Sequence, residues 1–515
     1  MRGSALNALI RNDDGAVAAT YALALTGLIL MAGVGFDYGR LAAMDSELQN
    51  GADQAALAGA TQLNGASDAC QRASDAARLM VTNTTVVAND SNTVTITSEP
   101  TCDATGNIRF WQDKDRATAA TSDANAHFIE VTVATRSVDY AFTPITGLIR
   151  GSSLAAAMAG LGSSICKVPP LFMCNPDQTN DSEFTIANYI GKGIRLVAND
   201  GGGNYGSGNF GYLQSNAGNG ASAIKDTLGK TEVPGDCISA DSVTTKPGAN
   251  VSVLDALNTR FDIYTGNTTN PCGSSGAACP PSANTRKDLI YPSNGNGNTC
   301  TNPAAWAVPT NGYAPTSSTM PLTTGQITAT APMGYPRDMC HAISATGNCT
   351  GGIIGTGTWD RNAYFKTNSP TNYAAAFDIS ATFGTSTPTR YQVYKYEAAN
   401  AGSRLQPQST TGGTSRPQPF CVTPGVPVGG TAPDRRVLSI AVINCGSGLN
   451  GSAGPLSPKK WVDVFLPEPS LRRTINGTKY SEASDVYVEV IGPTTLGGGS
   501  TAAQQIRRDV PYLVN

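Results

Sequence analysis

Histidine is nearly missing from this 515-residue sequence, which contains only His127 and His341. No CxxC pair occurs among the twelve cysteines, so the paired ligands of a structural zinc site are lacking. The sequence also lacks GxSxG, HExxH and the P-loop motif, which mark serine hydrolases, zinc proteases and nucleotide-binding proteins. His127 opens an alternating strand pattern and His341 follows a cysteine, positions where structural roles are common. We therefore expect that the protein is not an enzyme.

Charge is also scarce, since charged residues make up only 14% of the chain. The 35 Lys and Arg residues nearly balance 38 Asp and Glu residues, and no basic stripe forms, which argues against nucleic-acid binding. Gly206–Gly211 matches GxGxxG, but turn-forming residues follow it where a dinucleotide-binding fold needs a helix. The sequence therefore predicts no cofactor, no metal and no small-molecule substrate.

Glycine and proline are plentiful, with 56 and 31 residues, and they predict extensive loops. The length of the chain suggests two or three domains. Because zinc-type spacing is absent, the cysteines indicate disulfides and a body outside the cytosol. Their spacing favours four pairs: Cys70 with Cys102, Cys166 with Cys174, Cys272 with Cys279, and Cys340 with Cys349.

The longest apolar stretch, residues 16–36, contains no charged residue. A helix of this length is about 31 Å long, which matches the hydrocarbon core of a bilayer. Arg2 and Arg11 precede the stretch and Arg40 follows it, a weak excess that favours a cytoplasmic N-terminus. A cleaved secretory signal is the alternative. Helical spacing of apolar residues continues to Leu63, which favours a retained anchor.

The order of motifs around this stretch is specific. Gly15 is followed by AVAATYALAL, then by GFDYGR from Gly35 and by LQNGADQAALAGA from Leu48. This order resembles the N-terminal region of TadG-like pilus-assembly proteins of the tight-adherence (Tad/Flp) system, over about the first 65 residues. The resemblance implies a prepilin-type peptidase site between Gly15 and Ala16. Thr20, however, occupies the place of a glutamate in Flp-type pilins, and Gly15 as a merely flexible residue is the alternative.

Small residues recur along the expected helix and would let another helix approach closely. They are Gly35, Gly39, Ala52, Ala55, Ala56 and Gly59. We predict that this surface packs against other single-span helices. The alternative is that the alanine-rich part forms a helix that packs only on its own domain.

Beyond the helix the apolar period changes from helical to alternating. Strands are predicted at 93–97, 108–111 and 128–134, a helix at 152–160, and further strands at 436–444, 461–465 and 486–491. We predict an α+β fold, in which a long N-terminal transmembrane helix continues into an amphipathic helix packed on an antiparallel sheet, with a large loop-rich β insertion. The predicted parts are a leader-like segment (1–15), the transmembrane helix (16–36), its amphipathic extension (37–66), an α+β pilin-like unit (67–165), a loop-rich disulfide-containing insertion (166–433) and a C-terminal β segment that completes the sheet (434–515).

The resemblance implies a function in Flp/Tad pilus assembly that supports surface adhesion. The expected protein is a membrane-anchored scaffold or a minor pseudopilin-like component, single-pass in a bacterial inner membrane with a periplasmic body. Its expected partners are the membrane and other Tad/Flp envelope or pseudopilin subunits, without nucleic acid. The alternative is an anchored or secreted adhesin that binds surface polymers directly.

Overall fold

The computed structural model divides the chain into two compact units, Met1–Gly162 with Asp509–Asn515, and Ser163–Arg508. We call these the first and the second unit. The structure describes residues 16–64, 67–81, 101–123, 125–142, 150–166, 169–198, 205–214, 218, 220–231, 238–239, 242–246, 251–264, 272, 276–293, 300, 306–349, 351–368, 373, 377–429, 434–446, 449, 451–494 and 506–514. The leader-like segment 1–15 and the strand predicted at 93–97 lie outside these residues.

The first unit is built on one long helix, α2 (Ala16–Ala60), which is about 67 Å long. Its first half exposes apolar side chains on every side, including Leu23, Leu25, Leu28 and Met31. Its second half buries one face, because apolar residues recur there at spacings of three and four. That face carries Met44, Leu48, Ala52, Ala55, Ala56 and Ala60. One continuous helix therefore has a first half that is apolar and exposed and a second half that packs against the rest of the first unit.

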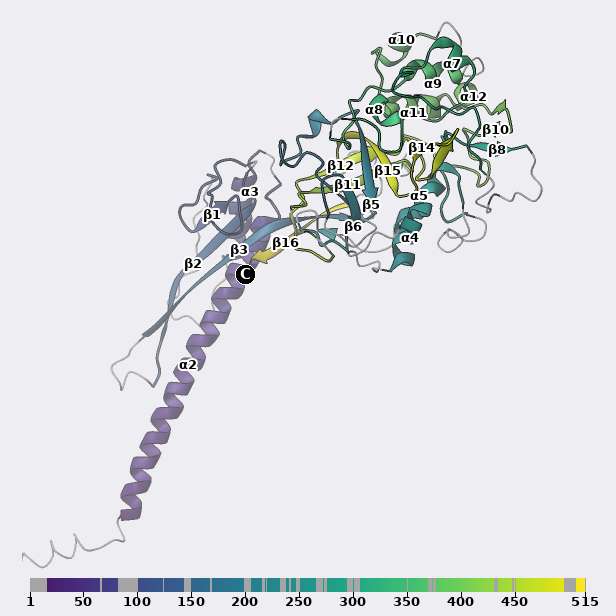
Figure 1. The fold of residues 1–515 in the computed structure, drawn as a ribbon. Coiled ribbons are helices and arrows are strands. Elements are labelled where there is room, and N and C mark those ends of the chain that lie inside the picture. The colour runs from purple at the N-terminus through teal and green to yellow at the C-terminus, as the bar shows by residue number, and fades with distance from the viewer. Residues whose placement is uncertain are drawn as a thin grey trace, which may run out of the picture. The chain divides into compact units, whose positions relative to one another are not determined.

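A second helix and an antiparallel sheet cover the buried face of α2. Helix α3 (Ala69–Val81) contributes Ala73 and Ala77 to this core. Strand order in the sheet is β1-β2-β3-β16, and β7 pairs with the end of β3. Figure 1 shows β2 and β3 running as a hairpin beside α2. The strands are β1 (Ile108–Trp111), β2 (Phe128–Asp139), β3 (Arg150–Cys166), β7 (Ile238–Ser239) and β16 (Ile506–Val514).

The helix predicted at 152–160 is wrong, because these residues lie within strand β3. Alanine has a high intrinsic helix propensity, but pairing with a neighbouring strand in the folded protein overrides this weak preference. Ala155, Ala157 and Ala159 lie opposite Val133, Val131 and Ile129 of β2. All three alanines are buried in the core that α2 also enters. Their small side chains leave room for the helix above the sheet.

The second unit contains a closed barrel with strand order β11-β12-β15-β5-β6-β4. The strands are β4 (Leu171–Cys174), β5 (Gly193–Ala198), β6 (Asn209–Tyr212), β11 (Val437–Ile443), β12 (Lys460–Phe465) and β15 (Asp485–Pro493). The C-terminal strands β11, β12 and β15 therefore complete this barrel, whereas we expected them to complete the sheet of residues 108–134. Of the described strands after residue 434, only β16 joins that earlier sheet. Every residue of β11 is buried, as expected for a strand with both faces covered.

Short helices and two small sheets surround the barrel. The sheets contain β8 (Ile290–Pro292), β10 (Gly413–Ser415) and β9 (Gln408–Thr410), and β13 (Arg473–Ile475) with β14 (Thr478–Ser481). The helices are η3 (Ile186–Asn188), α4 (Ala221–Gly229), η4 (Val251–Leu254), α5 (Asp255–Asn258), η5 (Thr259–Phe261), α7 (Thr324–Thr328), α8 (Met339–Ala342), α9 (Arg361–Thr367), α10 (Ile379–Phe383), α11 (Arg390–Ala399) and α12 (Ala401–Arg404). The chain is therefore a mixed helix-and-sheet protein with a long apolar N-terminal helix.

Candidate functional site

The apolar half of α2 is the most distinctive feature of the described chain. By length and composition this helix can cross a membrane. Leu23, Leu25, Leu28 and Met31 are 60–76% exposed in the part of the chain that the structure describes, and burying such apolar side chains in lipid is favourable. A helix of this kind fits single-pass anchoring.

Asp37 and Arg40 attach the hairpin to the helix just beyond the apolar half. The Asp37 carboxylate, only 2% exposed, accepts hydrogen bonds from the backbone N–H groups of Ala141 and Phe142, at 2.8 and 2.9 Å. The Arg40 guanidinium donates to the Asp139 carbonyl oxygen at 2.9 Å. The aspartate-arginine pair seen in the sequence therefore joins α2 to the end of β2. Both residues belong to the GFDYGR motif, but the sequence did not indicate their partners, which come about one hundred residues later.

The predicted helix-packing residues fall into two groups. Ala52, Ala55, Ala56 and Gly59 are buried in the first unit's own core, against α3 and β2. A Cβ atom added to Gly59 would meet Ile129 at 2.5 Å. These four positions are thus occupied by the chain itself, as in the alternative reading, because the same small side chains that admit a foreign helix also admit α3. Among the described residues, no atom apart from the adjoining helix itself lies within 4 Å of a Cβ added to Gly35 or Gly39, so this pair stays open there.

The start of α2 bears on the predicted peptidase site. Gly15 lies outside the described residues, and Ala16 is the first residue of the helix. The Thr20 hydroxyl donates to the Val17 carbonyl oxygen within the same helix, at 2.9 Å. Thr20 carries no charge, so it offers no carboxylate for the amino terminus of a neighbouring subunit.

Five disulfides join ten of the cysteines in pairs. Cys70 is bonded to Cys102, Cys272 to Cys279, and Cys340 to Cys349, which are the pairs favoured by spacing. The pairing of Cys166 with Cys174 is wrong, because Cys174 is bonded to Cys445. Strands β4 and β11 are parallel neighbours in the barrel, and this brings two cysteines 271 residues apart together. Cys300 and Cys421 form a further bridge. Spacing alone finds only bridges that close short loops.

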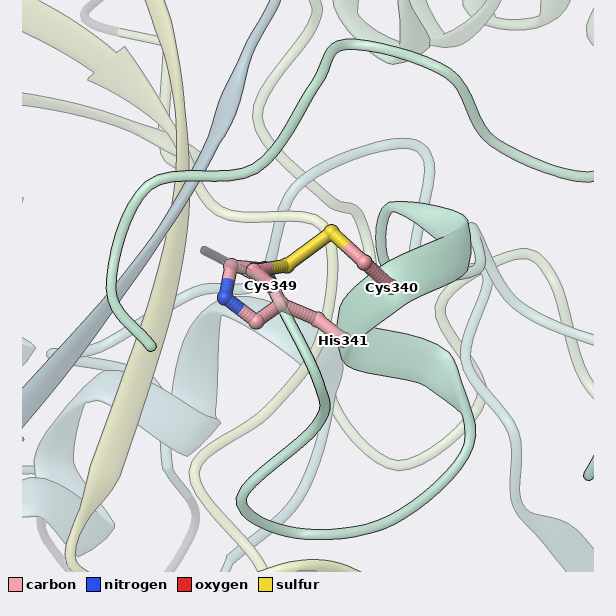
Figure 2. Close-up of side chains that lie close together, drawn as sticks. All are labelled: Cys340, His341 and Cys349. Atoms are coloured by element: carbon pink, nitrogen blue, oxygen red, sulfur yellow. A yellow bond between two sulfur atoms is a disulfide. The ribbon is translucent and has the colours of Figure 1, made fainter. Parts of the chain in front are cut away.

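His341 lies beside one of these bridges, as Figure 2 shows. The His341 ring and the two sulfur atoms of Cys340 and Cys349 lie within 4.8 Å of one another. The sulfurs are bonded to each other, so they are not the thiolates that a metal ion needs. Burial lowers the pKa of His341 to about 4, and its Nδ1 lies 3.2 Å from the Tyr487 hydroxyl oxygen. This arrangement is a structural contact in a closed interior.

His127 and the GxGxxG stretch also lie in positions that indicate structural roles. His127 Nδ1 lies 3.1 Å from the Gln112 carbonyl oxygen, immediately before β2. Gly211, the last glycine of the motif, lies inside strand β6, where an added Cβ atom would meet the Phe172 ring at 2.7 Å. A dinucleotide site would need that glycine to open a helix.

Lys287 is a buried amine that the sequence did not single out. Burial lowers its pKa to about 7, a value that suits a catalytic base or nucleophile. Its Nζ, however, lies 3.8 Å from the centre of the Trp306 ring and donates to the Thr285 and Arg416 carbonyl oxygens. The amine is thus enclosed by packing partners, with 4% of the residue exposed.

Several ion pairs are buried in the interior of the second unit. Arg390 pairs with Glu489 at 2.7 Å and with Asp338. Arg337 pairs with Glu468 at 2.6 Å. Such pairs are costly to break, since one partner is then left as an uncompensated buried charge. Each of these side chains is enclosed, so the pairs contribute structure rather than a reactive site.

One open pocket of about 580 Å³ lies beside α7, α9 and β9. Its lining is rich in hydroxyl and amide groups. The polar residues around it include Asn311, Thr328, Thr330, Lys366, Thr367, Gln408, Ser409 and Thr410. No residue of this pocket was predicted from the sequence, because its lining comes from separate parts of the chain, residues 311–332, 366–367 and 407–410.

Comparison with known proteins gives one match. Residues 15–62 match a family described as putative Flp pilus-assembly TadE/G-like. The match spans α2 and the turn after it, and it confirms the resemblance to TadG-like proteins. Neither the curated proteins nor the solved structures compared with this chain match it. Helix α2 and the turn after it are thus similar to a family of putative Flp pilus-assembly TadE/G-like proteins.

Proposed function

We propose that this protein is a non-enzymatic, membrane-anchored scaffold of Flp/Tad pilus assembly that supports surface adhesion. The observation that carries the proposal is the coincidence of the family match, residues 15–62, with helix α2. The apolar half of that helix would span the membrane. Its second half is a core element of the first unit, so the proposed anchor is continuous with the core of that unit.

The body would lie in the periplasm and residues 1–15 in the cytoplasm. Five disulfides among the described residues support an oxidising compartment. The bacterial inner membrane is the bilayer that separates these two compartments. The enclosed positions of His341 and Lys287 agree with a role that depends on surfaces rather than on catalysis.

The N-terminal peptide tests the anchor. We expect mass spectrometry of protein from the inner-membrane fraction to find residues 1–15 still attached, because Thr20 lacks the charge of the pilin glutamate. A peptide that begins at Ala16, found in sheared pili, would instead make the protein a minor pseudopilin. A mature chain that begins beyond Phe36 would refute the anchor.

Gly35 and Gly39 are the proposed contact with other Tad/Flp helices, because their side of α2 stays open. Leucine at both positions should block the close approach of a partner helix. We expect Gly35→Leu/Gly39→Leu to reduce cross-linking to small membrane subunits several-fold, while the protein remains in the membrane. Gly27→Leu is the matched control, since Gly27 lies in the same helix and also has open space around it. Equal cross-linking in both variants would disprove the contact.

Direct binding of surface polymers is the second candidate function. The hydroxyl- and amide-lined pocket beside β9 favours it, because such groups hydrogen-bond to sugars. Under this alternative the protein would be shed to the cell surface or exposed there. Retention in the inner-membrane fraction supports the scaffold instead.

A further inference from the structure

We propose that the end of the β2–β3 hairpin, at Tyr140–Phe142, lies in the lipid interface, so that the first unit meets the membrane at two places. The proposal rests on the proposed membrane span of α2. The occupant of this surface would be the outer leaflet of the same bilayer, because the surface is continuous with the exposed apolar half of the helix.

The position of Phe142 along the helix sets its depth. A Cβ atom added to Gly33 would lie 2.5 Å from the Phe142 Cβ atom, so only glycine allows this approach. The Phe142 ring also meets the Phe36 ring edge to face, with centroids 5.6 Å apart. Gly33 and Phe36 both belong to the uncharged stretch 16–36. Phe142 therefore lies level with the last turn of the span.

The backbone N–H groups of Ala141 and Phe142 have hydrogen-bond acceptors within the protein, as an environment with little water requires. Buried N–H groups need acceptors, and lipid provides none. The Asp37 carboxylate accepts from both Ala141 and Phe142. The Asp37 carboxylate therefore provides the hydrogen-bond acceptors for these two N–H groups. In an ordinary surface hairpin, water would provide them.

The side chains change character over a short distance, as they do at a membrane surface. Phe142 is 47% exposed and Tyr38 is 71% exposed, and aromatic residues of this kind gather at the interface. Arg150, which pairs with Asp139 on the neighbouring strand, supplies an exposed cation, and cations attract lipid phosphate groups. No charged residue occurs between Asp139 and Arg150 in the sequence. The exposed Phe142 ring lies against the uncharged part of α2, and Arg150 lies on strand β3 of the same hairpin. This order, from apolar to aromatic to charged, matches the change in polarity from the core of a leaflet to its headgroups.

Photo-cross-linking in the full-length protein tests this proposal. Benzoylphenylalanine replaces one residue at a time, and the protein is reconstituted into vesicles of phosphatidylethanolamine and phosphatidylglycerol. Position 142 is the test, and Leu25, 60% exposed within the span, reports on the anchor. Leu154 is the matched control, since it is 57% exposed on β3 of the same unit but lies beyond Arg150. Only variants with wild-type protease resistance are compared.

We expect positions 25 and 142 to label lipid, with yields several-fold above that of position 154. Labelling at 25 but a background yield at 142 would overturn the hairpin contact and leave the anchor standing. Labelling of protein instead of lipid at 142 would also overturn it, because another chain would then cover this surface. A background yield at 25 would refute the membrane span itself.

Discussion

Replacing Glu397 with alanine is expected to lower the free energy of unfolding of the second unit by at least about 5 kcal/mol. The Glu397 carboxylate, on α11, accepts hydrogen bonds from the hydroxyl groups of Tyr335, Tyr364 and Tyr373. It also pairs with the Arg286 guanidinium at 3.2 Å. Each hydroxyl left unpaired inside the protein costs about 1–3 kcal/mol, and an unpaired buried charge costs about 3–5 kcal/mol. The loss is comparable to the whole stability of many domains.

Denaturant unfolding of the full-length protein in detergent measures this loss, with tyrosine circular dichroism as the signal. Glu482→Ala is the matched control, because Glu482 forms only a partly exposed ion pair with Lys479 at 3.0 Å. A surface pair of this kind contributes at most about 1 kcal/mol. Glu397→Gln should fall between the two variants, since glutamine keeps one acceptor oxygen but not the charge. Equal midpoints for the two alanine variants would contradict the role assigned to Glu397.

Replacing Cys174 and Cys445 together by serine is expected to cost about 4 kcal/mol of stability in the second unit. A disulfide stabilises mainly by restricting the unfolded chain, and the effect grows with the length of the loop that it closes. This bridge joins residues 271 positions apart. It also holds together β4 and β11, which are parallel neighbours in the barrel. The shift of the unfolding midpoint under non-reducing conditions measures the loss.

The bridge between Cys272 and Cys279 provides the comparison, because it closes a loop of only seven positions in the same unit. Its replacement by serines should cost about 2 kcal/mol. A short-loop variant that loses as much stability as the long-loop variant would show that loop length does not set the difference. The structural role of the Cys174–Cys445 bridge would then need another explanation.

The candidate site was only partly predictable from the sequence. The apolar span and the small residues of α2 were visible because each depends on neighbours along one helix. The exposure of Gly35 and Gly39 was not visible, nor was the burial of Ala52 and Gly59. A small side chain shows that another helix or strand can approach closely, but it does not show which one does. The partner turned out to be α3 and β2 of the same chain.

Non-local pairing explains the remaining errors. The strand at Leu154–Ala159 looks helical by composition, and only its pairing with β2 makes it extended. The strands β11, β12 and β15 were expected in one sheet and belong to another structure, the barrel. An alternating or buried pattern reports that a strand is covered, but the pattern is the same for any partner strand.

The sequence by itself determined the position and length of the apolar helix and the absence of familiar catalytic motifs, and it indicated three of the five bridges between described cysteines. The helix depends on the transfer of its own apolar side chains from water, and the bridges depend on cysteines that are close in the sequence. Both are local properties of the chain. Only the tertiary structure decided which strands close the barrel, which cysteine meets Cys174, and where Asp37 finds the backbone of residues 141 and 142. Those contacts join segments about one hundred or more residues apart, and they form only when the whole chain buries its apolar surface at once.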